Sequence, residues 1–205
     1  MKKIDFKILI ITCLVCLLPI ILGIAFYNQL PEKVAIHFNI NNEPDGYFSK
    51  SAFVFGMPVI MVAIQSFCCI VSDLDDKNKE ANKKALKVIK WIIPVITVIL
   101  YIVTIIYALG NTLDIRRIVM IILGLEFIVL GNYTPKTKGQ INGMKKLNEE
   151  DYKKIARPVG YMLIVDGLLC FISILFNKYV SIAIIPLLII QGIALHIYTF
   201  RKNRK

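Results

Sequence analysis

The chain has 205 residues, of which 57% are hydrophobic and 19% are charged, and its formal net charge is +11. Soluble domains are usually about 45–50% apolar. The charged residues are crowded into short segments between long apolar runs, which excludes an ordinary soluble domain and favours an integral membrane protein. The sequence contains no DNA- or RNA-binding motif that would account for its basic charge, so we expect no nucleic-acid partner.

Apolar runs predict six transmembrane helices, because about 20 apolar residues cross the hydrocarbon core of a bilayer. In chain order they cover residues 8–27, 51–72, 91–109, 118–130, 159–176 and 180–200. The fourth run is short and contains Glu126, and the fifth contains Asp166. The first run is too long for a cleaved secretory signal and lacks a cleavage pattern. The predicted fold is an all-α membrane bundle of six helices, a single domain over residues 1–205.

The basic residues predict the orientation of this bundle. With six crossings, 20 of the 25 Lys and Arg residues fall on the side that holds both termini. Short cytoplasmic loops carry an excess of Lys and Arg, so both termini are expected in the cytoplasm of a cell with this protein in its cell membrane. Residues 131–158 form the most basic of the predicted cytoplasmic loops. Attraction to anionic lipids accounts for the remaining positive charge.

The segment 28–50, between the first two predicted helices, is expected outside the cell. Residues 34–40 are rich in β-branched and aromatic side chains, which indicates a short extended stretch. Residues 41–46 carry dense turn chemistry, strongest at Pro44-Asp45-Gly46. We expect a short strand and a tight turn on the outer surface, with Phe38, Tyr47 and Phe48 at the membrane interface.

Two patterns resemble one known family. The first is Leu30-Pro31-x-x-Val34-x-x-His37-Phe38-Asn39, followed by Glu43-Pro44-Asp45-Gly46-Tyr47-x-Ser49-Lys50. The second is Gly131-Asn132-Tyr133-Thr134-Pro135-Lys136-x-Lys138. Both are similar to elements of the SdpI-like family of bacterial multi-pass proteins, which includes immunity proteins against a secreted membrane-active toxin. Asn42 stands where that family often has glycine, and asparagine also tolerates a left-handed turn. The stretch 142–147 lacks the tryptophan that the family carries after its second element.

This resemblance implies a bacterial immunity protein, with signalling as a further role. A peptide toxin would bind the outer face and a cytoplasmic regulator would bind the 131–158 loop. The candidate binding residues of segment 28–50 are Pro31, His37, Asn39, Pro44, Asp45, Gly46 and Tyr47. An alternative for this segment is a structural turn that keeps two helices in register. For His37, a hydrogen bond to Asp45 is favoured over metal binding.

Ionisable groups within the apolar runs, or at the end of one in the case of Lys90, form a second candidate site. They are Lys90, Glu126, Asp166 and His196. A charge at the centre of a membrane helix costs about 2.5–3.5 kcal/mol on insertion scales. One hypothesis is a small transporter that uses these carboxylates. The structural hypothesis pairs Glu126 with Lys90, and Asp166 with His196 or with Gln191.

Several other features predict packing rather than chemistry. Small residues suited to close helix contacts are Gly124, Gly131, Gly160, Gly167, Gly192 and Ala194. Prolines at 19, 58, 94 and 186 are expected to kink four helices. The five cysteines all lie in predicted helices, so we expect no metal site, and the chain has no motif of an enzyme or a cofactor site. An accessory subunit of a membrane complex is a further alternative.

Overall fold

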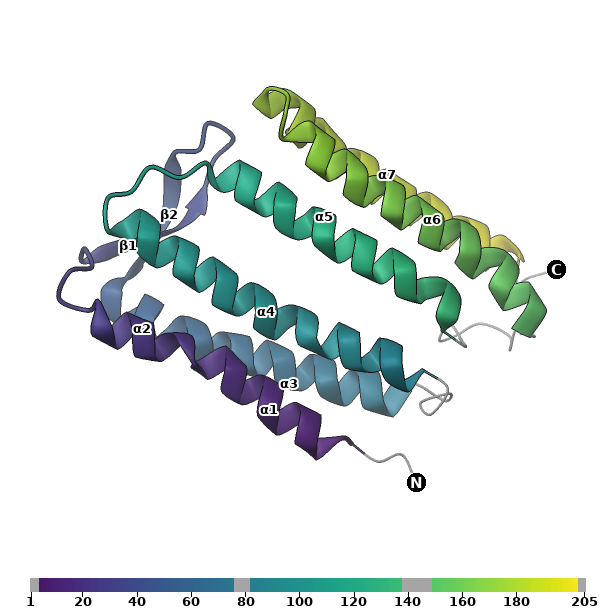
Figure 1. The fold of residues 1–205 in the computed structure, drawn as a ribbon, viewed down its shortest axis with the longest axis horizontal. Coiled ribbons are helices and arrows are strands. Elements are labelled where there is room, and N and C mark those ends of the chain that lie inside the picture. Colours follow the sequence, from purple (N-terminus) through teal and green to yellow (C-terminus); the bar gives the residue numbers. More distant parts are fainter. Residues whose placement is uncertain (1–3, 76–81, 138–148, 203–205) are drawn as a thin grey trace. The chain divides into compact units, whose positions relative to one another are not determined.

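The computed structural model describes residues 4–75, 82–137 and 149–202. Helices dominate, with one pair of strands near the N-terminus (Figure 1). In chain order the elements are α1 (Phe6–Leu17), α2 (Pro19–Ala25), β1 (Lys33–Phe38), β2 (Pro44–Ser49), the π-helix η1 (Ala52–Gly56), α3 (Met57–Asp75), α4 (Lys83–Ala108), α5 (Ile115–Tyr133), the 3₁₀ helix η2 (Thr134–Lys136), α6 (Glu149–Ser173) and α7 (Lys178–Lys202).

Five helical stretches of the described chain are long and apolar enough to cross a membrane. They are Phe6–Ala25, Ala52–Leu74, Lys83–Ala108, Ile115–Lys136 and Tyr152–Ser173, each of 20 to 26 residues. These stretches confirm an all-α membrane protein, and they include the fourth run, which looked short in the sequence. The last helix, α7, is apolar over the shorter stretch Lys178–Ala194, so a sixth crossing stays a prediction.

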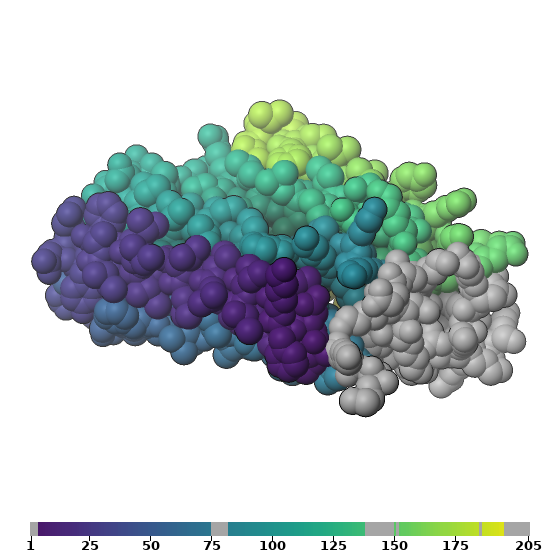
Figure 2. Space-filling view, turned by 60° about the horizontal axis from the view of Figure 1, so that its bottom comes forward, coloured from purple at the N-terminus to yellow at the C-terminus, as the bar shows by residue number. Residues whose placement is uncertain are grey.

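Large apolar side chains on these helices are exposed, as expected of surfaces that face lipid. On α1 and α2 the exposed ones include Phe6, Ile10, Leu14 and Ile21. In the space-filling view, the N-terminal helices form a continuous band on the visible surface (purple, Figure 2). Only a minority of the residues in each of these helices is buried within the protein, as expected for helices surrounded by lipid.

The chain forms two compact units. The first combines Met1–Leu74 with Leu86–Ile115, and the second combines Asp75–Ala85 with Arg116–Lys205. The first unit therefore contains α1, α2, the strand pair, α3 and most of α4. The second contains nearly all of α5, with α6 and α7. Each unit has its own buried cluster of apolar side chains.

In the first unit, two prolines leave backbone carbonyls that other helices satisfy. Proline has no N–H, so the carbonyl four residues earlier loses its helical donor. For Pro58 this is the carbonyl of Val54, within the π-helix, and the Tyr101 hydroxyl of α4 donates to it at 3.2 Å. For Pro94 it is the carbonyl of Lys90, and Nε2 of Gln65 on α3 donates to it at 2.8 Å. Helices α3 and α4 thus complete each other's hydrogen bonds.

The strand pair packs on the ends of these helices. Val34 of β1 is fully buried and joins Leu30, Phe53, Tyr101 and Ile105 in one apolar cluster. The rings of Phe53 and Tyr101 are stacked, with centroids 4.5 Å apart. The strands are therefore part of the core of the first unit and hold a fixed position on it.

In the second unit, paired glycines bring α5 and α6 into close contact. Gly124 faces Gly167, and Gly131 faces Gly160, so the two helices run antiparallel. A Cβ atom added at Gly131 would lie 2.6 Å from the Gly160 carbonyl oxygen, and one at Gly167 would lie 2.6 Å from that of Gly124. The packing role predicted for these four glycines is confirmed. Gly192 differs, because a Cβ there meets nothing within 4 Å.

Replacement of Gly131 by alanine should destabilise the packing of α5 on α6. The new methyl group meets a backbone carbonyl that has little room to move, and overpacking of this kind costs roughly 1–3 kcal/mol. The measurement is thermal unfolding of the purified protein in detergent. Gly192→Ala is the matched control, with an unchanged or slightly higher melting temperature. Equal melting temperatures for the two variants would show that the close contact is absent.

Candidate functional site

Segment 28–50 forms a β-hairpin with an irregular register. Strand β1 pairs antiparallel with β2 from Lys33 opposite Ser49 to Phe38 opposite Pro44, with shifts on either side of His37. The expected strand is confirmed, and the turn includes Asn41 and Asn42 of the expected 41–46 stretch, but its strongest part was expected elsewhere. Pro44-Asp45-Gly46 lies in β2, where an open edge tolerates proline. Pairing with β1 outweighs the turn propensity of these three residues.

Asparagines build the actual turn. Oδ1 of Asn39 accepts hydrogen bonds from the N–H groups of Asn41 and Glu43, at 2.8 and 3.1 Å. Asn42 has a φ of +64°, the left-handed conformation in which asparagine was expected to replace glycine. The site of the turn follows from the short amide side chains, which bond their own backbone.

Asn42 also fastens the tip of the hairpin. Its Nδ2 donates to the carbonyl of Leu113 at 2.7 Å, and its Oδ1 accepts from the N–H of Ile115 at 2.8 Å. The ring of Phe38 meets that of Tyr107 edge-on, with centroids 4.8 Å apart. Phe38 and Phe48 are half-buried on the helix ends. These contacts join residues about 70 positions apart, so they could not be predicted from the sequence.

The other face of the hairpin presents polar side chains to the outside of the unit. Side chains alternate along β2, so that Asp45 and Tyr47 are exposed while Pro44 and Phe48 are half-buried. Nδ1 of His37 lies 2.5 Å from Oδ1 of Asp45, which confirms the predicted hydrogen bond. The hairpin therefore carries an ordered polar face.

Gly46 permits this arrangement, and the remaining candidates surround it. A Cβ atom at Gly46 would lie 2.8 Å from the Cβ of His37 across the strands. Nδ2 of Asn39 donates to Glu43 at 3.0 Å, so its role is in the turn. Pro31 is exposed before β1. The structure thus brings His37, Asp45 and Gly46 together directly.

The intramembrane candidates do not form one site. Lys90 was expected to pair with Glu126, and this expectation is wrong. Its ammonium group lies 2.7 Å from Oδ2 of Asp73, and both side chains are almost fully buried, at 3% and 0% exposure. The same oxygen accepts the backbone N–H of Asp5 at 2.9 Å, which ties the start of α1 to the pair.

A polar network continues from this ion pair into the first unit. Besides the Lys90 carbonyl, Nε2 of Gln65 donates to the Thr12 hydroxyl at 2.9 Å. It also lies 3.1 Å from the Cys69 sulfur, and all of these side chains are buried. The signal in the sequence was a lone glutamine in an apolar run, together with Lys90 four residues before Pro94.

The second unit holds the other two carboxylates. Asp166 is buried, and the side-chain amide of Gln191 on α7 faces it; with the amide oriented to donate, its nitrogen lies 3.1 and 3.0 Å from the two carboxylate oxygens. Of the two predicted partners, Gln191 is the one found. Glu126 is half-buried in α5 and has no hydrogen-bond or ion-pair partner among the described residues. His196 lies in α7, and its side chain is outside the part that the structure describes.

The motif at residues 131–136 ends α5 and docks it on α6. Gly131 and Pro135 both pack against Gly160, and Nζ of Lys136 donates to Oδ1 of Asn132 at 2.8 Å. The same ammonium lies 5.5 Å from the centroid of the Tyr133 ring. These contacts make the motif a local structural element. Of the predicted 131–158 loop, residues 138–148 lie outside the described part, and α6 already begins at Glu149.

Over the described residues, no group of three or more His, Cys, Asp or Glu side chains is placed to hold a metal ion. Cys13 and Cys69 instead contact hydroxyl groups. The sulfur of Cys13 lies 3.3 Å from the Ser66 hydroxyl, and that of Cys69 lies 3.9 Å from the Thr12 hydroxyl. These contacts are those of packed side chains.

The buried ion pair should dominate the stability of the first unit. Lys90→Met leaves the Asp73 carboxylate buried without its cation, which costs about 3–5 kcal/mol. Asp73→Asn combined with Lys90→Met should cost less than the two single changes together. Chemical unfolding in detergent measures this cycle. Lys154→Met removes an exposed pair with Glu150 and should cost at most about 1 kcal/mol. A Lys90→Met cost no larger than that of Lys154→Met would contradict the buried pair.

Comparison with known proteins gives one family match. A model of a domain of unknown function, DUF1648, matches residues 14–62, from α1 through the hairpin into α3. No curated protein and no solved structure matches the chain significantly. The match covers the fastened hairpin and the helices on which it packs. The chain is therefore a multi-pass membrane protein that is similar to DUF1648 over this region.

Proposed function

We propose that this protein protects a bacterial cell against a membrane-active peptide, which it recognises at the β-hairpin. The observation that carries the proposal is the fixed polar face of the hairpin, with His37 and Asp45 joined at its centre. The resemblance to the SdpI-like family points to the same role and to a coupled signalling function. The protein acts by binding, without catalysis.

Rigid anchoring supports a recognition role. Val34 is fully buried, and Asn42 makes two hydrogen bonds to the 113–115 backbone. A binding surface that is already ordered loses little conformational entropy when its partner arrives. A hairpin that served only as a spacer would need this anchoring but not the exposed face of Asp45 and Tyr47.

Charge indicates the kind of peptide. Segment 28–50 contains three carboxylates and two lysines, in a chain that carries +11 overall. One of the lysines, Lys50, is already paired with Glu32 at 2.9 Å. The segment thus has a net negative formal charge within a basic chain, and its exposed carboxylates favour a cationic peptide as the ligand.

The proposed topology places the hairpin outside the cell. The lysine distribution puts both termini in the cytoplasm, with α7 as the sixth crossing and 28–50 as the first external segment. In the first unit, the hairpin lies at the opposite end of α3 from the Asp73–Lys90 pair (Figure 1). A toxin that arrives from outside would meet the hairpin first.

A small transporter or permease-like protein is the alternative. Its supporting observation is Glu126, a carboxylate without a described partner in the apolar part of α5. Asp166 and Asp73 favour it less, because both are bound by neighbouring side chains, as structural groups are. The two functions differ in which residue the activity needs.

The test is survival of a sensitive bacterium that expresses this chain and is challenged with cationic membrane-active peptides. His37→Ala and Asp45→Ala should each abolish protection, since they break the centre of the polar face. The two side chains are 71% and 44% exposed, so the fold should persist. Quantification of the protein in the membrane fraction checks that the variants still insert.

Lys33→Ala, at the far end of β1, is the matched control and should leave protection intact. Loss of protection only in Glu126→Gln would favour the transporter instead. Full protection by both hairpin variants would rule out recognition at the hairpin. Absence of protection by the wild-type chain, at normal membrane levels, would refute the immunity function.

A further inference from the structure

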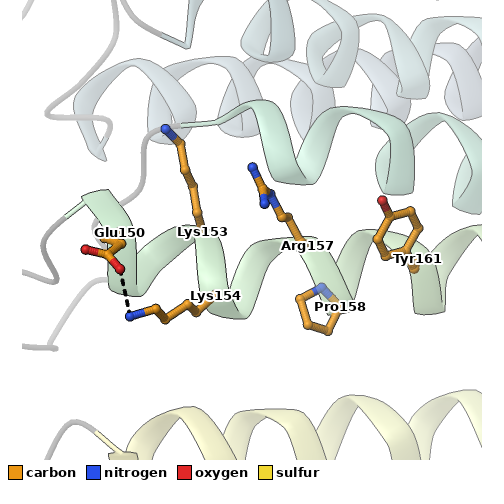
Figure 3. Close-up of a pocket in the computed structure, with 6 residues that line it drawn as sticks. All are labelled: Glu150, Lys153, Lys154, Arg157, Pro158 and Tyr161. Atoms are coloured by element: carbon orange, nitrogen blue, oxygen red, sulfur yellow. Dashed lines mark ion pairs between the residues drawn. The ribbon is translucent and has the colours of Figure 1, made fainter.

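The first three turns of α6 form a hollow that the function above does not use. Its lining residues are Glu150, Lys153, Lys154, Arg157, Pro158 and Tyr161 (Figure 3). Three of the six are cations and one is a carboxylate. That carboxylate, Glu150, lies 3.0 Å from Nζ of Lys154. The six lining residues together have a net positive formal charge, which suits an anionic ligand.

Spacing gathers the key side chains on one side of the helix. Lys153, Arg157 and Tyr161 follow each other at intervals of four residues, which places them on one face. Figure 3 shows all three extending to the same side of α6. A guanidinium and an ammonium on adjacent turns can bind two oxygens of one phosphate group.

The position along the helix sets the depth of the hollow in the bilayer. The apolar stretch that can span the membrane begins at Tyr152, so Lys153 and Arg157 lie in its first turns. Tyr161 lies about 6 Å farther along the helix axis than Arg157. It is 69% exposed, and tyrosine is enriched at the level where headgroups meet acyl chains. The cations thus stand at headgroup depth, and the aromatic ring stands just below them.

We propose that this hollow binds an anionic phospholipid, with its headgroup phosphate held by Lys153 and Arg157 and its glycerol and upper acyl chain against Tyr161 and Pro158. Basic pockets beside transmembrane helices bind anionic headgroups in this way. The exposed aromatic ring and proline distinguish a lipid from a soluble phosphate, which would use only the cations. A bound lipid fixes the depth of α6 and links the second unit to the composition of the membrane.

The test reconstitutes the full chain in nanodiscs of phosphatidylcholine with a minor share of phosphatidylglycerol, and counts retained phosphatidylglycerol by native mass spectrometry after detergent extraction. Lys153→Gln with Arg157→Gln should weaken retention by about tenfold or more, because both charge-assisted hydrogen bonds to the headgroup phosphate are lost. Lys83→Gln with Lys84→Gln removes the same charge from exposed positions on α4 and is the matched control. That control should retain the lipid as the wild type does.

Tyr161→Ala distinguishes a phospholipid headgroup from free inorganic phosphate as the ligand. It should reduce retention of phosphatidylglycerol and leave any binding of inorganic phosphate unchanged. Equal retention in the α6 and α4 double variants would overturn the proposal, since the lipid would then respond only to total charge. Binding of inorganic phosphate at the hollow, with lipid retention insensitive to Lys153, Arg157 and Tyr161, would overturn it as well. Melting temperatures in detergent verify that each variant is folded.

Discussion

The structure depends on one constraint, which is that polar groups within a membrane helix need partners inside the protein. Pro58 and Pro94 each remove a backbone donor, and in each case a side chain of the neighbouring helix replaces it. Tyr101 of α4 serves α3, and Gln65 of α3 serves α4. These two hydrogen bonds join α3 and α4 at two levels along their length. The Asp73–Lys90 ion pair joins them at a third, near the C-terminus of α3 and the N-terminus of α4. The register of α3 against α4 is consequently well determined.

The hairpin uses that fixed register. Val34 is buried against Phe53 of the π-helix η1 and Tyr101 of α4. Asn42 then bonds the backbone just after α4. These contacts bury one face of the hairpin. The other face, with His37, Asp45 and Tyr47, is the one available to a partner. The same contacts that stabilise the first unit therefore define the surface that we propose for recognition.

The second unit follows a different rule. Its α5 and α6 approach closely through glycines seven residues apart on each helix, and van der Waals contact replaces hydrogen bonding as the main attraction. Arg116, Ser173 and Ser181 link the ends of α5, α6 and α7, with Arg116 donating to the Ser181 hydroxyl at 2.8 Å. The motif at 131–136 closes the opposite end against α6. Residues that resemble a family signature thus have a clear packing role beside any functional one.

Much of the architecture is readable in the amino-acid sequence, because the bilayer imposes a length and a polarity on each crossing. The apolar runs predicted the five spanning helices, and the glycines at 124, 131, 160 and 167 were predicted as residues of close helix contacts. Local chemistry also predicted the left-handed Asn42 and the His37–Asp45 bond, since these depend on neighbours within the hairpin. All of these features arise from periodicity or from residues close together in the chain.

Partners distant in the chain could not be predicted in the same way. Lys90 was interpreted as the partner of Glu126, and its true partner is Asp73, because a sequence does not show which helix faces which. Strand pairing likewise confines the turn to the asparagine part of the expected 41–46 stretch and places Pro44–Gly46 in β2, since the ladder and the buried Val34 outweigh local turn propensity. Only tertiary packing determines these contacts. A buried charge or carbonyl needs a partner, and the fold decides which group lies close enough to provide it.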